Sequence, residues 1–357
     1  AAAPATPQAA PQAPAAAPKK PAAPAAAAPA APAENDCHVR TIERAAFRKE
    51  MERLHKEEKM DFLECLTGID REDDGLAVIY HLESTATGKR TCVQVVCEGR
   101  ETPNVPTVSD LWDIANIYER EVYDFYGIIF TGHPDMRRIY MREDWVGYPF
   151  RKDDETEKNN PLRMTNEPLA DTTDTYTLAP DGTLTKEQRN IFGEEDYVVN
   201  IGPQHPSTHG VLHFRVCLQG EVIKKIDPIL GYIHRGVEKI SEQMTYPQTL
   251  ALTDRLDYLG AMQNRHALCM CIEKAMGVEV SDRVKVIRTI MDELQRIDSH
   301  ILFFSCLAQD LGATTAFLYG FRDREKILDI FEETCGGRLI LNYNTIGGVM
   351  ADIHPNF

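Results

Sequence analysis

Apolar residues recur along this chain with two different periods, and each period predicts a different kind of element. Residues 45–57 combine many charges with apolar side chains at helical spacing, which predicts an amphipathic helix. A second helix is predicted over 111–125, where apolar residues recur at spacings of three and four. Ser109-Asp110 would cap its start and Gly127 would end it, because glycine tolerates the left-handed conformation at helix ends.

Two β-rich runs, residues 76–83 and 89–98, lie between these helical patterns. Thr85-Ala86-Thr87-Gly88 separates them, and a short glycine-containing stretch between two such runs is typical of a hairpin. We therefore predict one small α/β unit over residues 34–152.

A second ordered pattern begins after Tyr197. Alternation over 212–218, a turn at Gly220-Glu221 and a further run over 222–226 predict a half-buried hairpin. Three helical patterns follow: 254–276, closed by Gly277; a helix that starts after Ser281-Asp282; and 323–334. A short antiparallel sheet that leads into a helical bundle is thus predicted for residues 197–357, and the fold class of the chain is α+β.

Two segments show neither period. Residues 1–33 contain 19 Ala and 9 Pro, and such repeats lack the apolar mass to fold, which predicts a disordered tether. Residues 153–196 are rich in acidic residues and contain Pro161, Pro168, Pro180 and Asp181-Gly182. This composition predicts an acidic linker that crosses a surface.

Charge and hydropathy exclude several classes. The 357 residues carry a formal net charge of −16, and an acidic chain is a poor nucleic-acid binder because phosphate neutralisation needs clustered Lys and Arg. No apolar run approaches the roughly 20 residues that span a bilayer. The Ala/Pro tail lacks the apolar stretch of a signal peptide. Secreted and transmembrane classes are therefore excluded.

The nine cysteines point to reduced thiols rather than to metal or disulfide chemistry. Their number is odd, they are scattered through apolar stretches, and no C-x-x-C occurs. Cys269 and Cys271 form the closest pair, but two positions apart on a helix they point about 200° away from each other. We predict no metal site.

The densest polar cluster is Gly202–Gly210, which contains His205 and His209. On a helix this spacing would bring both imidazoles to one face and could bind zinc, but Pro206 and Gly210 argue against a helix. A loop that presents both rings to a cleft fits better. Histidines that satisfy buried loop carbonyls are an equally good alternative.

Two further clusters have ordinary structural explanations. The acids of Asp254–Tyr258 would be common partners of a helix dipole at a helix start. Gly231–Lys239 is typical of a turn that carries Arg235 into a helix, and a cap with a surface ion pair would explain it. The chain has no phosphate-binding glycine loop, no G-x-S-x-G and no H-E-x-x-H, so nucleotide binding and hydrolysis have no support.

These clusters resemble one family closely. Gly202–Gly210, His234-Arg235-Gly236, Glu238-Lys239, Asp254–Tyr258 and Asp310-Leu311-Gly312-Ala313 resemble the 49-kDa (D) subunit of respiratory complex I. The first unit resembles the 30-kDa (C) subunit through three runs: Glu119–Gly127, His133–Ile139 with Glu143-Asp144-Trp145, and Gly147–Asp153. Both signatures in this order are similar to a fused C/D subunit and cover nearly all of residues 34–357.

The resemblance implies an α/β domain of the 30-kDa type followed by a domain related to the large subunits of nickel–iron hydrogenases. Those hydrogenases hold their metals with paired C-x-x-C motifs, which this chain lacks, so a nickel site is not expected. In the family, the corresponding cavity is the head-group end of the quinone chamber. The 49-kDa subunit of the family runs well beyond Phe357, so we expect its later helices to be missing here.

The resemblance also implies roles for individual residues. His209 and Tyr258 match the pair that hydrogen-bonds the quinone head group, Asp310 matches the carboxylate that contacts this His, and His205 shapes the same loop. Arg235 matches the arginine packed against the terminal [4Fe-4S] cluster, whose cysteines belong to the neighbouring B subunit. Quinone, menaquinone or ubiquinone, would be the substrate, and this chain alone would bind no cofactor.

One position departs from the family pattern. Many members carry a His near that cluster, where this chain has Ile340. Loss of an ionisable neighbour puts proton-coupled tuning of the cluster in doubt, and our hypothesis is a low-potential quinone such as menaquinone.

The implied function is that of a peripheral-arm subunit of proton-translocating NADH:quinone oxidoreductase, on the cytoplasmic side of the bacterial inner membrane. Expected partners are the B subunit, the H subunit of the membrane arm, the I subunit and the other peripheral-arm subunits, with no nucleic acid. The alternatives are a related ferredoxin- or quinone-linked complex, and a non-catalytic scaffold homologue.

Overall fold

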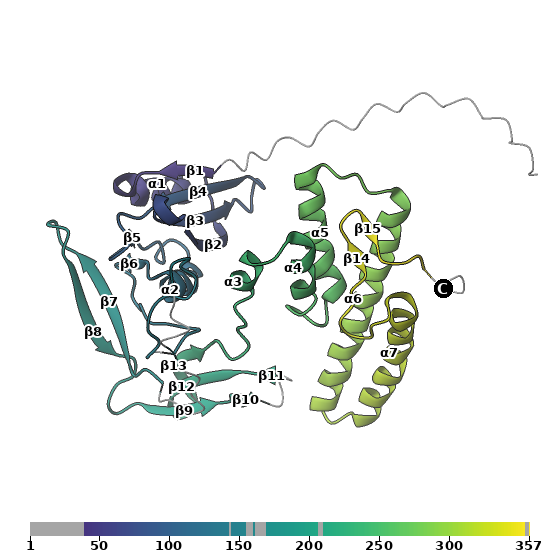
Figure 1. Cartoon of the computed structure of the whole chain (residues 1–357). Coiled ribbons are helices and arrows are strands. Elements are labelled where there is room, and N and C mark those ends of the chain that lie inside the picture. The colour runs from purple at the N-terminus through teal and green to yellow at the C-terminus, as the bar shows by residue number, and fades with distance from the viewer. Residues whose placement is uncertain (1–38, 143, 155–159, 161–168, 206–209, 354–356) are drawn as a thin grey trace, which may run out of the picture.

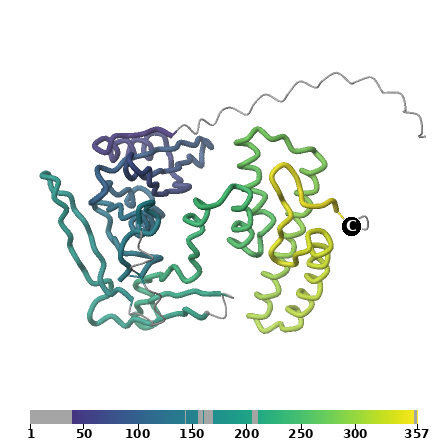
Figure 2. Tube along the Cα trace, viewed as in Figure 1, coloured from purple at the N-terminus to yellow at the C-terminus, as the bar shows by residue number. Residues whose placement is uncertain are grey.

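The computed structural model describes residues 39–142, 144–154, 160, 169–205, 210–353 and 357. The Ala/Pro segment 1–33 lies outside this part of the chain. Figure 1 shows a first unit of strands and helices, a hairpin and a small sheet beside it, and a group of helices on the other side. The trace in Figure 2 passes from the sheet to those helices through one connecting segment, which contains α3 (Val237–Glu242).

The first unit is built on a four-stranded sheet of order β1-β4-β3-β2, in which β1 runs parallel to β4 and the other pairs are antiparallel. Helix α1 buries Phe47, Met51 and Leu54 in the core of this unit, and α2 contacts β2. Its elements are β1 (Val39–Ile42), α1 (Arg44–Lys56), β2 (Phe62–Asp70), the 3-10 helix η1 (Glu72–Asp74), β3 (Leu76–Glu83), β4 (Arg90–Val96), β5 (Asn104–Pro106), α2 (Ala115–Tyr126) and β6 (Ile129–Thr131).

The predicted hairpin and both predicted helices of this unit are present, but α2 begins later than its predicted cap at Ser109-Asp110. The residues before Ala115 form turns instead, with Val108 O accepting from Leu111 N at 2.9 Å. The Trp112 indole N–H donates to Met60 O at 3.0 Å and ties these turns to the core. The helix ends as predicted at Gly127, whose φ is 71°.

The segment predicted as an acidic linker is partly regular structure. Its second half forms an antiparallel hairpin of β7 (Thr172–Leu178) and β8 (Leu184–Asn190). Asp181 accepts from Thr183 N at 3.0 Å in the turn, and Gly182 has φ 84°. The prediction missed this strand pair because the segment is acidic and the side chains of β7 and β8 are mostly solvent-exposed, so no apolar stripe marks the strands.

A three-stranded sheet of order β13-β12-β9 follows, and it contains the predicted hairpin. Arg215 and Cys217, the polar half of the alternation, are buried, whereas Phe214 and Leu218 are half-buried. Arg215 is buried because it pairs with Asp227 of the next strand, at 2.6 Å. Its strands are β9 (Tyr197–Ile201), β12 (His213–Gln219) and β13 (Val222–Ile229), and β10 (Gln204–His205) and β11 (Gly210–Val211) form a separate two-stranded sheet.

The helical unit pairs α6 with α7 along much of their length, and α5 packs beside them. Gly320 of α7 allows this approach, since a Cβ there would lie 1.8 Å from Ser305 Oγ of α6. The predicted cap of α6 is present, because Ser281 Oγ accepts from Val284 N at 3.5 Å. The elements are α4 (Tyr246–Thr253), α5 (Ala261–Met276), α6 (Asp282–Asp310), α7 (Thr314–Cys335), β14 (Asn344–Thr345) and β15 (Gly348–Val349).

The predicted helix over 254–276 is wrong in its first turn. Helix α4 ends in short i→i−3 bonds, from Arg255 N to Leu252 O and from Leu256 N to Thr253 O, and α5 begins only at Ala261. Asp254–Tyr258 therefore lie in a turn between two helices rather than at a helix start. Among the described residues, no helix is long and apolar enough to cross a membrane.

Candidate functional site

The residues predicted to form a site lie on three separate elements. Tyr258 is on the turn between α4 and α5 and is 57% exposed, and Asp310 is the exposed last residue of α6. The backbone of His205 pairs with Gly210 in the β10–β11 hairpin. His209 lies outside the described residues, so its predicted contacts with Tyr258 and Asp310 stay predictions.

The chain enters this hairpin through a close backbone approach. Gly202 has φ 87°, and a Cβ there would lie 1.6 Å from Leu212 O, so only glycine fits. Figure 1 shows the β10–β11 hairpin extending from the three-stranded sheet on the side that faces the helices. The described ends of the histidine-containing run, Gln204–His205 and Gly210–Val211, pair as antiparallel strands, while residues 206–209 lie outside the described part of the chain.

Arg235 lies on the loop between β13 and α3, which confirms the predicted turn that carries an arginine into a helix. Gly231 packs against the first unit with φ 100°, and a Cβ there would lie 2.9 Å from Tyr140 O. At the other end of the loop, Lys239 Nζ donates to Arg151 O of the first unit at 2.9 Å. The loop is therefore held on the first unit at both ends.

Four rings, three from the first unit and one from the loop, form a cluster beneath Arg235. The His234 ring centroid lies 4.9 Å from that of Phe125 and 4.8 Å from that of Tyr140. Phe125 also stacks on Phe150 at 4.1 Å. Stacked contacts of this kind add stability beyond the buried area and fix ring orientation.

One buried carboxylate fixes the segment that carries Tyr140. Asp124 Oδ2 accepts from the backbone N–H groups of Ile139, Tyr140 and Met141 at 3.1, 2.8 and 2.9 Å. Its other oxygen accepts from Arg138 at 2.7 Å. The acid of the Tyr123-Asp124-Phe125-Tyr126 run therefore has a structural role that its motif alone did not reveal.

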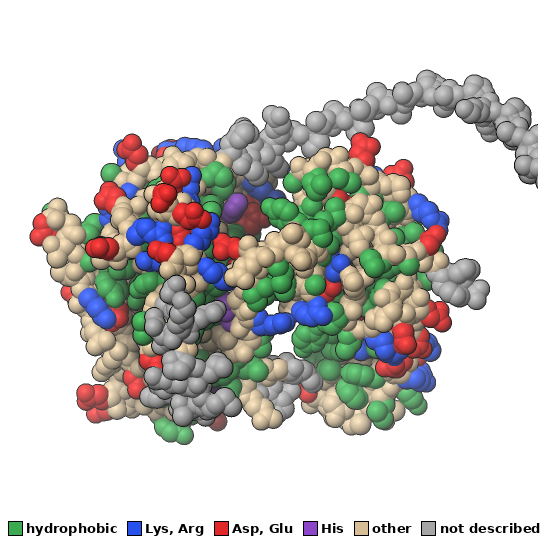
Figure 3. Space-filling view, in the orientation of Figure 1, with side chains coloured by type: hydrophobic (Ala, Val, Ile, Leu, Met, Phe, Trp, Pro, Cys, Tyr) green, Lys and Arg blue, Asp and Glu red, His purple; other side chains and the backbone are tan. Residues whose placement is uncertain are grey.

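An open groove of about 1060 Å³ lies beside the loop. Its wall holds three cations and three carboxylates, together with the rings of Trp145, Phe150 and His234. The charged residues are Arg235, Lys239, Lys152, Glu72, Asp154 and Glu242. Figure 3 shows a hollow between the two lobes of the molecule with Lys and Arg side chains at its border. Lys152 pairs with Glu72 at 3.3 Å and Lys239 with Glu242 at 3.9 Å, so the wall carries both signs of charge.

A carboxyl that titrates near neutrality lies below this groove. Burial, with Glu238 adding to it, raises the pKa of Glu121 to about 7. The Tyr140 hydroxyl donates to Glu121 at 3.5 Å. Sequence reasoning missed this residue, since nothing in its motif distinguishes a buried glutamate from an exposed one.

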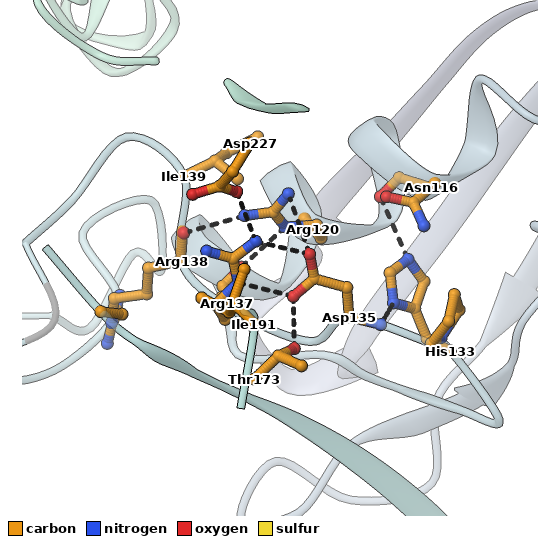
Figure 4. A network of polar contacts seen from close by, with 12 residues as sticks. Asn116, Arg120, His133, Asp135, Arg137, Arg138, Ile139, Thr173, Ile191 and Asp227 are labelled. Carbon is orange, nitrogen blue, oxygen red and sulfur yellow. Dashed lines mark hydrogen bonds and ion pairs between the residues drawn. The ribbon is translucent and has the colours of Figure 1, made fainter. Parts of the chain in front are cut away.

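A second polar network joins the first unit to the sheet (Figure 4). Asp135 pairs with Arg137 at 2.6 Å and with Arg120 at 3.6 Å, and it also accepts from the Thr173 hydroxyl of β7. Arg137 reaches across to Asp227 of β13 at 2.8 Å. Burial opposes ionisation of Asp135, but the guanidinium groups of Arg137 and Arg120 hold its pKa below the usual range.

Next to this network lies a buried pair that is neutral at pH 7. Burial raises the pKa of Glu119 to about 8 and lowers that of His133 to about 4, although their side chains approach to 3.9 Å. His133 Nδ1 accepts from Asp135 N at 2.9 Å, so Nε2 carries the proton and donates to Asn116 O at 3.1 Å. The pair is structural, and Asn116 and His133 mark it at the edge of Figure 4.

The described residues contain no group of three or more His, Cys, Asp or Glu placed to hold a metal ion. Ile340 lies half-buried in the irregular segment that follows α7. The guanidinium, phenol and carboxylate groups of the candidate residues can donate or accept hydrogen bonds and stabilise charge.

Two family models match the chain. One, described as respiratory-chain NADH dehydrogenase, 30 Kd subunit, matches residues 40–160, and the other, described as the 49 Kd subunit, matches residues 310–357. Curated relatives match over a longer stretch. The NADH-quinone oxidoreductase C/D subunit of Bacteroides thetaiotaomicron is 68% identical over 89% of this chain and 62% of its own length.

More distant relatives carry the same name. The protein of Nitrosospira multiformis is 38% identical over 81% of this chain and 48% of its own length, and that of Aquifex aeolicus is 41% identical over 70% and 44%. The chain thus spans less than two thirds of the length of these relatives.

Proposed function

The chain belongs to the family of fused C/D subunits of NADH-quinone oxidoreductase, and from this premise we propose that it forms the quinone head-group site of that complex. The observation that carries the proposal is the placement of Tyr258 and Asp310. Both present polar groups at the surface of the helical unit, on a turn and at a helix end, rather than in its core. Their exposure leaves both polar groups open to a substrate, which supports the proposal.

In this proposal His209 and Tyr258 bind the quinone head group. A quinone carbonyl that accepts two electrons becomes basic and takes up two protons. An imidazole N–H and a phenol O–H can stabilise the developing charge and deliver those protons near neutral pH. Asp310 orients the imidazole of His209 and favours its protonated form, and His205 shapes the loop.

Electrons would arrive from the terminal [4Fe-4S] cluster of the B subunit, on the side where Arg235 lines the groove. A guanidinium close to a cluster favours its reduced, more negative form and so raises its reduction potential. This chain would couple quinone reduction to proton translocation as a peripheral subunit on the cytoplasmic side of the bacterial plasma membrane. The B, H and I subunits of the complex would be its direct partners.

Ile340 supports a finer proposal about the quinone. With an apolar residue at the position where family members carry a histidine, the cluster potential should not follow pH, which suits a low-potential quinone such as menaquinone. Redox titration by electron paramagnetic resonance tests this, and a midpoint that still moves with pH would contradict it.

The main experiment uses membranes that carry the complete complex with Tyr258→Phe or His209→Ala. NADH:quinone activity should fall at least tenfold, while NADH:ferricyanide activity, which draws electrons upstream, should persist. Loss of both activities would assign these residues a structural role. Survival of both would favour the second candidate function, a non-catalytic scaffold, which the exposed apolar surface of the helical unit also fits.

A further inference from the structure

We propose that His234 is a positioning residue: its ring, seated on the cluster formed by Phe125, Tyr140 and Phe150 of the first unit, fixes the direction of Arg235. The inference rests on the proposed role of Arg235 beside the terminal cluster. It adds that the 30-kDa part of the fusion belongs to the redox site, because it supplies three of the four rings.

The contacts of the Arg235 side chain do not fix its direction. Within the part of the chain that the structure describes, no hydrogen bond or ion pair holds its guanidinium, and the side chain is exposed. Its direction must therefore come from the backbone of its loop. That loop runs between two glycines with positive φ, Gly231 at 100° and Gly236 at 61°, so its conformation needs a side-chain anchor.

His234, which directly precedes Arg235, is such an anchor. Its side chain is only 16% exposed, whereas Ile233 on its other side is 82% exposed. Tyr232 gives a second anchor at the start of the loop, where its hydroxyl lies 2.8 Å from His213 Nδ1. Between His234 and the start of α3, a stretch that the structure describes throughout, no other side chain is buried.

The His234 ring is held mainly by stacking, and its one ion-pair contact in the described structure is a long one, to the exposed side chain of Glu238. Its buried Nε2 atom makes no hydrogen bond within the described residues, and the nearest carboxylate oxygen, on Glu238, lies 3.9 Å away. The ring plane of His234 is inclined by 27° to that of Phe125 and by 29° to that of Tyr140, which are stacked contacts. A phenyl ring should therefore replace the imidazole, but a methyl group should not.

Beneath the rings the support is rigid. Asp124 holds Tyr140 through three backbone N–H groups, and the Tyr140 hydroxyl reaches Glu121. The chain of contacts runs from α2 through Asp124 and Tyr140 to His234, and from there to Arg235. No step in this chain uses a residue proposed to bind quinone.

The test is a redox titration of the terminal cluster in the complete complex, for Arg235→Gln, His234→Ala, His234→Phe and the double variant Arg235→Gln with His234→Ala. Arg235→Gln should lower the midpoint potential. His234→Ala should lower it by part of that shift, His234→Phe should leave it unchanged, and the double variant should shift no further than Arg235→Gln. Amide hydrogen exchange over residues 231–236 should be faster in the two variants that carry His234→Ala, and unchanged in Arg235→Gln and His234→Phe.

Each other outcome overturns a specific statement. If Arg235→Gln shifts the potential and His234→Ala does not, the positioning role fails while the proposed function stands. Additive shifts in the double variant would also overturn it, because His234 would then act independently of Arg235. If Arg235→Gln has no effect, the proposed role of Arg235 fails and the inference fails with it.

Discussion

The first unit and the helical unit bury their residues in different ways. Among the described residues, the core of the first unit joins 21 buried hydrophobic side chains, and that of the helical unit joins eight. Both units also bury carboxylate–guanidinium pairs, such as Asp124–Arg138 in the first unit at 2.7 Å. In the helical unit three such pairs accompany a much smaller apolar core: Glu273–Arg288 at 2.6 Å, Asp254–Arg265 at 2.9 Å and Asp298–Arg324 at 2.9 Å. The helical unit also leaves large apolar side chains in solvent, including Phe303, Phe304 and Leu311.

This difference shows which interactions stabilise the fold of each unit. The first unit has the larger apolar core, so its structure depends mainly on volume and shape, with buried pairs such as Asp124–Arg138 added to it. The helical unit depends on ion pairs whose partners must both be present, and its apolar surface is the kind that marks contacts with other protein. The candidate quinone residues lie on the second kind of surface, whereas the rings beneath Arg235 are anchored in the first.

The largest expected effect comes from a matched pair of phenylalanines. Phe47→Ala in the first unit should lower the free energy of unfolding by about 3–5 kcal/mol, because a fully buried ring leaves a cavity against Tyr80. Phe304→Ala, at a ring 62% exposed, should cost less than about 1 kcal/mol. Urea unfolding followed by fluorescence of Trp112 and Trp145, both in the first unit, measures the former, and circular dichroism the latter. Comparable losses for the two variants would contradict the contrast between the regions.

A second pair tests the buried ion pairs. Arg288→Met leaves Glu273 buried without its partner and should destabilise the helical unit by about 3 kcal/mol. Arg283→Met removes a surface pair with Asp352, whose side chains are 66% and 64% exposed, and should cost at most about 1 kcal/mol. Thermal unfolding by far-ultraviolet circular dichroism compares the two. Equal costs would mean that burial does not govern these pairs.

The smallest expected effect is a pH dependence in the first unit. Burial raises the pKa of Glu119 to about 8 in the folded protein. The contribution of this residue to the free energy of unfolding is therefore fully present below the ordinary pKa of a glutamate, and it is lost as pH rises through 8. Stability should fall by about 2 kcal/mol between pH 6 and 8. Glu119→Gln should remove this slope, and Glu98→Gln, at a side chain 78% exposed, should keep it. An unchanged slope in Glu119→Gln would show that other groups cause the pH dependence.

The kinds of elements could be predicted from the sequence, and their ends less well. Periodicity found α1, α5, α6 and the two hairpins, because their apolar stripes are continuous. Periodicity missed the break between α4 and α5, because the apolar spacing continues through the turn that joins them. It also assigned the turns that precede Ala115 to helix α2. It could not find that Arg215 faces inward, since that depends on Asp227 in the neighbouring strand.

Some features of the candidate site could likewise be predicted from the sequence, and others could not. Local motifs placed Arg235 on a turn before a helix, and this placement is confirmed. The loop predicted for the histidine run stays a prediction, because residues 206–209 lie outside the described part of the chain. The ring cluster could not be predicted, because it joins Phe125 to a residue more than a hundred positions later. Nor could the burial of Glu121, which is a property of packing and not of its motif.

The most direct measurement of the central claim is photo-crosslinking of the complete complex with an azido-quinone. We predict that the label attaches to the turn around Tyr258 or to the Gly202–Gly210 run, and that excess unlabelled quinone abolishes it. Labelling confined to other parts of the chain, or unaffected by competing quinone, would contradict the assignment of this site.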